Sequence, residues 1–386
     1  GGAGPEPFSI ECTTFRADTY GPGGNHRPQG VRFSKSLAQD AARRDFTVNA
    51  LYANARTGEL IDPTGGLADL EHRVLRATNR DAGLILRDDG LRILRMVRFA
   101  CELGFSIDPA TYAAAENNVS GLLDLPAERL WQEFSKILLS DARYHAAQPD
   151  GSAAHYRGLL LLRDLGALYL LLPPLKEGEG IPQRPEYHAY TVLMHGLHAC
   201  ECAPPTLSLR LAALLHDVGK PFCLAKNGRM LGHDREGARI AAGCLQNLKC
   251  PGALVERVAL LIDQHMFDLD GRAKPPTLRK RILQWGPEVT LELAALREAD
   301  FIGSGLLSLP IPTADRWRKT LDSMEKEGAP FSIRELQVTG REIMEELGLP
   351  PGPQVGMVKQ ALWLHCAVRP SDNQKKRLLR LAHGIA

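Results

Sequence analysis

The sequence predicts a short α+β segment followed by a long all-α body. Residues 8–15 alternate apolar and polar side chains, which is typical of a strand, and residues 30–33 can form a second short strand. From Gly66 onward the apolar residues recur with the period of a helix. Pro/Gly-rich breaks at residues 172–185, 306–313 and 349–353 interrupt this helical body, and no internal repeat is visible.

The helical periodicity is clearest in residues 88–103, 128–139, 156–172, 188–200, 207–216, 236–248, 254–265, 289–300 and 333–347. Residues 47–52 are expected to form a strand or the edge of a helix. The α+β part is too small to close its own sheet, and the chain opens Gly-Gly-Ala-Gly-Pro without a Met. We therefore expect a fragment or a truncated gene model.

The length and composition indicate an ordinary globular protein of two or three domains, with 386 residues, 44% hydrophobic and 24% charged. The net charge is only +2, so any nucleic-acid surface has to be a local basic patch, as at residues 43–44, 87–98 and 375–380. The eight cysteines are expected to be reduced thiols, which places the protein in the cytoplasm. The most apolar stretch, residues 158–175, is too short and too charged to span a membrane.

The first candidate site combines two arginines with an aspartate and an asparagine inside seven residues. Arg43 and Arg44 are followed by Asp45 and Asn49. Adjacent guanidinium groups offer forked donors that suit a triphosphate. A solvated charged turn would account for the same letters equally well.

The second candidate site lies in residues 87–99, where a helix would place Asp89, Arg92 and Met96 on one side with Arg95 alongside. Cytosine and adenine both carry an exocyclic amine beside an unprotonated ring nitrogen, so one carboxylate and one guanidinium can satisfy either base. Guanine and uracil present a carbonyl there instead. The alternative is a helical ion pair worth a few tenths of a kcal/mol.

Five strings in order resemble the motif set of the class II CCA-adding enzymes and bacterial poly(A) polymerases: residues 11–16, 43–49, 61–66, 88–95 and 127–138. The resemblance implies that the α+β part is an incomplete polymerase-β-like nucleotidyltransferase palm. It implies that Arg44, Asp45 and Asn49 hold the ribose and triphosphate of ATP or CTP. Further implied roles are base reading by Asp89 and Arg92 with Arg95 beside them, support of the neck helices by Glu128 and Arg129, and an accessory carboxylate near the metals at Glu11. Asp88 stands where the family more often has Glu.

The family opens with a Gly-Gly-x-x-Arg-Asp loop and an Asp-x-Asp strand, whose carboxylates bind the two Mg²⁺ ions of nucleotidyl transfer. The resemblance places both before residue 8, and residues 1–7 contain neither. We therefore expect that residues 1–386 alone do not transfer nucleotides, although they still bind tRNA.

A second chemistry lies in the helical body, where histidines and aspartates recur near expected helix ends. His195 lies on an expected helix with His188 seven residues earlier, and His216-Asp217 ends an apolar helix that stops at Gly219. His233, His265 and Asp300 follow. A lone histidine is more often a structural residue, but this mixed N/O set suits a divalent Mn, Fe, Co, Ni or Zn ion.

Residues 186–305 resemble the HD phosphohydrolase superfamily. The resemblance implies that His195, His216, Asp217 and Asp300 are metal ligands, where Asp263 competes for the last position and Asp300 is preferred. It implies that His233 and His265 hold a second metal or bind phosphate. Lys220 would neutralise a phosphate oxygen, and the metal would supply hydroxide for attack on phosphorus.

These resemblances imply a nucleotidyltransferase head (1–80), a helical neck (81–175), an HD domain (176–305) and a helical RNA-binding tail (306–386). The tail rests on residues 338–356, which resemble the segment that grips tRNA in CCA enzymes, and a helix hairpin around a Gly/Pro turn would fit the same letters. The expected function is CCA addition to tRNA 3′ ends from CTP and ATP, with an HD domain that trims phosphates from RNA ends. The alternatives are an A-adding enzyme or poly(A) polymerase, a hydrolase whose head only binds RNA, and a catalytically silent RNA-binding protein.

Overall fold

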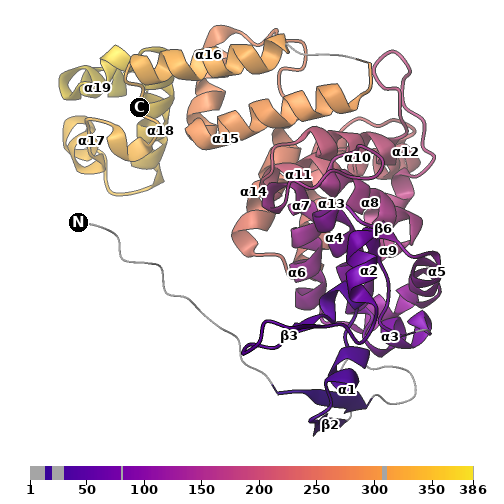
Figure 1. Ribbon diagram of the computed structural model, residues 1–386. Helices are drawn as coiled ribbons and strands as arrows, with labels where there is room; N and C mark the ends of the chain where they lie inside the picture. The colour runs from indigo at the N-terminus through magenta and orange to yellow at the C-terminus, as the bar shows by residue number, and fades with distance from the viewer. Residues whose placement is uncertain (1–13, 20–29, 80, 307–310, 386) are drawn as a thin grey trace. The chain divides into compact units, whose positions relative to one another are not determined.

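The computed structural model describes residues 14–19, 30–79, 81–306 and 311–385 (Figure 1). The chain divides into two compact units, one formed by residues 1–173 with 247–250 and the other by residues 174–246 with 251–386. Within the described residues, all strands belong to the first unit. None of the described helices is long and apolar enough to cross a membrane. The finer division into head, neck, HD domain and tail remains a prediction.

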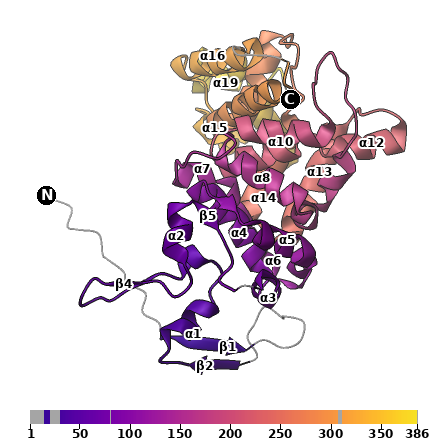
Figure 2. The same cartoon turned by 45° about the vertical axis from the view of Figure 1, so that its right-hand side comes forward.

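Three two-stranded sheets lie in the first unit. Strands β1 (Arg16–Thr19) and β2 (Gly30–Phe33) are antiparallel and lie side by side in Figure 2, with Arg16 opposite Phe33. The other pairs are antiparallel β3 (Tyr52–Ala53) with β4 (Leu60–Ile61) and parallel β5 (Val74–Leu75) with β6 (Ser106–Ile107). The expected strand at residues 30–33 is confirmed. Of the strand expected at 8–15, residues 8–13 lie outside the described residues, and the other two precede β1.

The helices of the first unit are α1 (Leu37–Ala42), η1 (Thr47–Asn49), α2 (Gly66–Glu71), α3 (Ala82–Asp88), α4 (Leu91–Leu103), α5 (Pro109–Asn118), η2 (Val119–Asp124), α6 (Ala127–Leu138), α7 (Ser140–Arg143), α8 (Ala154–Asp164) and α9 (Ala167–Leu171). Two expected helices are wrong in extent. The helix expected at 88–103 begins only at Leu91, because Asp89 is extended and accepts the Leu91 N–H at 3.1 Å. The helix expected at 156–172 breaks at Gly166, which has a positive φ of 75°.

The helices that follow are η3 (Pro173–Gly178), α10 (Val192–Cys202), α11 (Leu207–Leu215), α12 (Gly219–Asn227), α13 (His233–Asn247), α14 (Gly252–Gln264), α15 (Pro275–Gly303), α16 (Pro312–Lys326), η4 (Ile333–Glu335), α17 (Gly340–Leu347), α18 (Pro353–Val368), η5 (Pro370–Asp372) and α19 (Lys375–Ala382). Three expectations for these helices are wrong. His188 precedes α10 instead of lying on it, and Gly219 begins α12 instead of ending a helix. The segment 333–347 is divided because Thr339 and Glu342 form a capping box that starts α17.

A buried ion-pair network ties α4 to α6 in the first unit. Arg98 donates to Glu133 at 2.6 Å and to Glu102 at 2.7 Å, and Lys136 contacts Glu133 at 3.0 Å. Burial disfavours the Glu133 carboxylate, but the hydrogen bonds from Arg98 and Lys136 outweigh that cost and lower its pKa. The ionised form of Glu133 therefore stabilises the packing of α4 against α6.

We expect Glu133→Gln to destabilise the packing of α4 on α6 by about 1.5–3 kcal/mol, because Arg98 keeps Glu102 on its own helix but loses its charged partner on α6. Since the folded-state pKa of Glu133 is lowered, this contribution is fully present above its ordinary pKa and is lost as the pH falls through the lowered folded-state pKa. Hydrogen exchange of the α4 and α6 amides, normalised to intrinsic rates, measures the effect. Glu128→Gln on the exposed side of α6 is the control, and equal protection in both variants would contradict the prediction.

Candidate nucleotide pocket and metal centre

A cavity of about 600 Å³ in the first unit brings the predicted nucleotide-binding residues together. Its lining comprises Arg43, Arg44, Asp45, Asn49, Asp89, Leu91, Arg92, Arg95, Phe99 and Arg129. All six residues predicted to bind nucleotide are among them. Five arginines face two aspartates, so the cavity carries a positive charge that suits a polyphosphate.

Arg43 and Arg44 are held by Asp40, a residue that the sequence analysis missed. Asp40 is buried, and its two oxygens accept from Arg43 at 2.6 Å and from Arg44 at 3.2 Å. Burial disfavours the charge, but the hydrogen bonds from Arg43 and the Tyr52 hydroxyl lower the pKa of Asp40. The signal was present in the sequence, since Asp40 precedes the arginines by three and four residues.

Asp45 connects this arginine pair to helix α4. Its Oδ2 accepts from Arg95 Nε at 2.7 Å and lies 2.6 Å from Arg95 Nη2, while its Oδ1 accepts from Asn49 Nδ2 at 3.2 Å. Arg44 in turn donates to the Asn49 carbonyl at 3.0 Å. The residues expected to hold ribose and triphosphate thus form one network, with Arg95 as a member.

Asp89 and Arg92 both line the cavity, but they do not share a helix face as expected. Asp89 precedes α4 and accepts from Arg129 of α6 at 3.0 Å. Arg92 donates to the carbonyls of Ile85 at 2.9 Å and Arg43 at 2.7 Å, which fixes the plane of its guanidinium. Met96, expected beside them, is fully buried in the core.

The described residues of this cavity do not fit a magnesium site. Glu11, expected as an accessory carboxylate, lies outside the described residues. Among the residues that the structure describes in the first unit, no three His, Cys, Asp or Glu side chains lie close enough to hold an ion. Asp45 and Asp89 are instead paired with arginines.

The second candidate site lies where helix ends of the second unit converge. Two glycines permit the close approach. A Cβ on Gly219 would lie 2.3 Å from the His233 carbonyl, and one on Gly303 would lie 2.5 Å from the Ala199 nitrogen. The side chains brought together are His195 from α10, His216 and Asp217 after α11, His233 at the start of α13, His265 at the end of α14 and Asp300 from α15.

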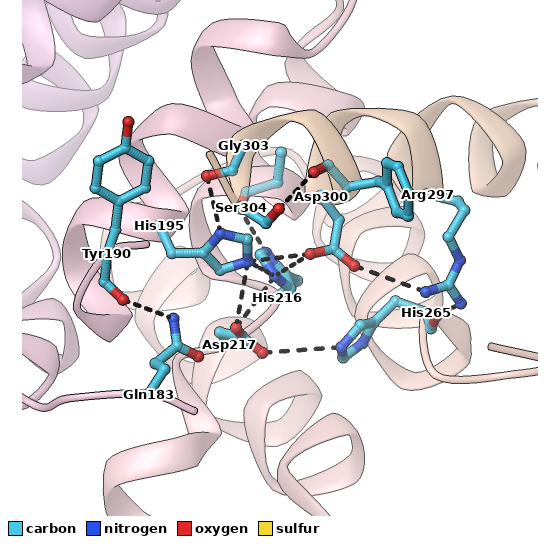
Figure 3. A network of polar contacts seen from close by, with 12 residues as sticks. Gln183, Tyr190, His195, His216, Asp217, His265, Arg297, Asp300, Gly303 and Ser304 are labelled. Carbon is cyan, nitrogen blue, oxygen red and sulfur yellow. Dashed lines mark hydrogen bonds and ion pairs between the residues drawn. The ribbon is translucent and has the colours of Figure 1, made fainter. Parts of the chain in front are cut away.

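Two groups with the spacing of metal ligands share the carboxylate of Asp217. Figure 3 shows His195 and His216 on one side of this carboxylate and His265 on the other. Its Oδ2 lies 3.3 Å from His216 Nε2 and 3.6 Å from His195 Nε2. Its Oδ1 lies 3.3 Å from His233 Nε2 and 4.0 Å from His265 Nε2. Each oxygen of one buried carboxylate therefore faces a different pair of imidazoles.

Asp300 adds a second carboxylate to the first group. Its Oδ1 lies 3.0 Å from His195 Nε2 and 3.4 Å from His216 Nε2. Asp263, the competing candidate, accepts instead from its neighbour Gln264. The structure thus places Asp300 at the position that the sequence analysis preferred.

The ring orientation of the four histidines is the one that metal ligands adopt. In each ring Nδ1 faces a backbone carbonyl, which can only accept, so Nδ1 carries the proton and Nε2 is left as the ligand atom. The four contacts are His195 to Gly303 at 3.2 Å, His216 to Ala213 at 2.8 Å, His233 to Met230 at 2.8 Å and His265 to Ile262 at 2.6 Å. His233 Nε2 is buried without a hydrogen-bond partner, as expected of an atom that binds an ion. The residues therefore fit a divalent metal.

The electrostatics of this set are dominated by its carboxylates. Burial disfavours a charged His216, but Asp217 and Asp300 outweigh it and raise its pKa to about 10, so without an ion Nε2 also carries a proton, which a bound metal would displace. Despite burial, His216 and Lys220 hold the pKa of Asp217 well below its usual range. Lys220 contacts Asp217 at 2.5 Å and donates to Gln183 at 2.6 Å. Burial lowers the pKa of His265 to about 3, so this ring is neutral and free to bind an ion.

The ligand set opens into a cavity of about 700 Å³ with polar and apolar walls. His188 lines it, with its ring 4.5 Å from that of His195, and Lys220 lines it as well. Met266, Leu269 and Phe301 supply apolar surface. The cavity has room for a nucleotide-sized group beside the ligand atoms.

Comparisons with known proteins identify the family of both units. Residues 4–76 match the family model of the poly A polymerase head domain, residues 104–148 that of a probable RNA- and SrmB-binding site of polymerase A, and residues 187–300 that of the HD domain. The chain is 38% identical to an A-adding tRNA nucleotidyltransferase of Deinococcus radiodurans, over 86% of this chain and 76% of that protein.

The chain is also 32% identical to a multifunctional CCA protein of Nitrosospira multiformis, over 78% of this chain and 72% of that protein. The crystal structure of the Bacillus stearothermophilus CCA-adding enzyme in complex with CTP superposes with a TM-score of 0.66 at 25% identity, over 96% of this chain and 78% of that one. This chain therefore belongs to the family of tRNA nucleotidyltransferases and poly(A) polymerases, with an HD domain in its helical part.

Proposed function

We propose that the cavity of the first unit binds ATP and CTP for addition to tRNA 3′ ends. The observation that carries this proposal is the convergence of all six predicted residues on one positive cavity. The arginines are pre-oriented by Asp40 and Asp45, so little side-chain entropy is lost when a triphosphate binds. The relatives named for A-adding and CCA activities support the same function.

Base selection is assigned in this proposal to Asp89 and Arg92. Asp89 would accept the exocyclic amine of cytosine or adenine, and Arg92 would donate to the ring nitrogen. The two backbone bonds of Arg92 use two of its five N–H groups and leave donors for a base. Arg129, expected only to support the neck, also contacts Asp89 and would adjust when a base arrives.

The proposal for the HD domain is a metal centre that hydrolyses phosphoesters at RNA ends. It rests on the two ligand groups that share Asp217. His195, His216, Asp217 and Asp300 would hold one divalent transition metal, and His233 and His265 with Asp217 a second. A metal bound there lowers the pKa of water and supplies hydroxide at neutral pH. Lys220 keeps Asp217 ionised and lines the cavity, where its charge can neutralise a phosphate oxygen.

A second candidate is addition of A alone, which the name of the Deinococcus radiodurans relative favours. CCA addition and A addition can be separated by the incorporation of labelled CTP and ATP into two tRNA transcripts, one that ends before the CCA and one that ends after its second C. The assay uses this chain beside a version that includes any upstream coding sequence. CTP incorporation supports CCA addition, and ATP incorporation alone supports A addition. Absence of both in the extended version would favour a hydrolase or a silent RNA-binding protein.

The predicted magnesium ions, the RNA-binding role of the tail and the cytoplasmic location remain predictions.

We expect Asp89→Asn to weaken the preference for CTP over UTP by about 1–3 kcal/mol, because an amide can donate to the uracil carbonyl that a carboxylate repels. Calorimetric titration with the four nucleoside triphosphates measures the preference. Asp88→Asn is the matched control, since the neighbouring carboxylate does not line the cavity. An unchanged preference in Asp89→Asn would refute the assignment of Asp89. Failure of the unaltered chain to bind any triphosphate would refute the pocket itself.

Because both ligand groups contain Asp217, we expect its substitution to remove both metal ions. Asp217→Asn should abolish binding in both groups, whereas His233→Gln should remove only the second metal, because the first group keeps its ligands. His198→Gln on α10 is the control, since His198 stacks on Tyr190 outside both groups. Equilibrium dialysis against Mn²⁺ with elemental analysis gives ions per chain. Wild-type metal content in Asp217→Asn would contradict the proposal.

A further inference from the structure

Arg297 is a buried cation that the proposed metal centre does not yet use. It lies on α15 one turn before Asp300, is 6% exposed, and lines the cavity of the HD domain. Burying a guanidinium is costly unless its donors are satisfied. Its Nε is buried without a hydrogen-bond partner, so the polar contacts of the guanidinium come from the other two nitrogens, while its carbon lies 5.9 Å from the centre of the Trp317 ring.

The two terminal nitrogens of Arg297 point in different directions. Nη1 lies 3.7 Å from Asp300 Oδ2, while Nη2 donates to the carbonyl of His265 and lies 3.3 Å from that of Phe267 (Figure 3). The carbonyls follow the end of α14, where the helix dipole favours a cation. One planar group thus touches a ligand of the first metal group and the backbone of a ligand of the second.

The contact with Asp300 separates the roles of its two oxygens. Oδ1 faces His195 and His216, whereas Oδ2 faces Arg297. A guanidinium on Oδ2 leaves Oδ1 as the ligand atom and sets the rotation of the carboxylate. The bond to the His265 carbonyl fixes the turn from which the His265 ring reaches Asp217. A lysine at this position could not replace Arg297, because its ammonium is a single point charge and could not contact Asp300 and the His265 carbonyl with two separate nitrogens.

We propose that Arg297 is a positioning residue that orients Asp300 and the His265 turn together, and so couples the occupancy of the two metal subsites. This inference rests on the proposed metal centre. Arg297 binds neither metal in this arrangement; it acts through the ligands. Loss of the guanidinium should weaken both subsites, although only one contains Asp300.

The test compares Arg297→Met with Arg318→Met in the full chain. Arg318 of α16 is the matched control, because it pairs with a carboxylate of α15, Glu298, but does not line the cavity. Mn²⁺ titration with elemental analysis gives the affinity of each subsite, and low-temperature electron paramagnetic resonance reports whether two ions are coupled. The melting temperature of the metal-free protein reports the purely structural contribution.

We expect Arg297→Met to lower Mn²⁺ affinity at both subsites by about 10- to 100-fold, the usual effect of losing a group that orients a ligand, and to lose the coupled spectrum. Arg318→Met should retain both. A lower melting temperature with wild-type Mn²⁺ affinity would overturn the proposal and leave a structural role. If Arg297→Met does not fold, Arg297→Lys decides, because it keeps the charge but should still lose the coupled spectrum; a wild-type spectrum there would overturn the proposal. Failure of the unaltered chain to bind Mn²⁺ would instead refute the metal centre.

Discussion

The buried carboxylate of Asp217 is the constraint on which the HD domain depends. A carboxylate without compensation is costly to bury, and this one lies among four imidazoles and the ammonium of Lys220. These groups come from different helices, so α10, α11, α13 and α14 have to bring their ends to one point. The absence of a side chain at Gly219 lets α12 and α13 start against each other. The absence of a side chain at Gly303 likewise lets the end of α15 pack closely against α10, and the Gly303 carbonyl orients the ring of His195.

In the nucleotide cavity the clustered charges are positive, and carboxylates compensate them. Five arginines in one cavity would repel one another and would be mobile without nearby carboxylates. Asp40, Asp45 and Asp89 each hold at least one of them by a direct contact. The cavity keeps an excess of positive charge after this pairing, and that excess is what a triphosphate requires. In both sites, then, a few carboxylates fix the orientation of the groups that meet the ligand.

The residues of both sites could be predicted mainly because their motifs resemble those of known families; the expected helix face of Asp89 and Arg92 was wrong. Asp45, Asn49 and Arg95 join one network, and His195, His216 and Asp300 meet across more than a hundred residues. The local geometry was harder to predict. The extended conformation of Asp89 and the start of α10 after His188 depend on caps and turns that periodicity does not report. Asp40 and Arg297 were missed because helical spacing of an Asp and an Arg is common on solvated surfaces. Only tertiary burial distinguishes these two from such pairs.

Whether one aspartate serves two metal subsites can be seen by anomalous X-ray diffraction from crystals equilibrated with Mn²⁺. We expect two anomalous peaks on opposite sides of the Asp217 carboxylate. One peak should lie among His195, His216 and Asp300, and the other between His233 and His265. Peaks that do not contact Asp217, or no peak at a Mn²⁺ concentration that saturates binding in solution, would contradict the claim.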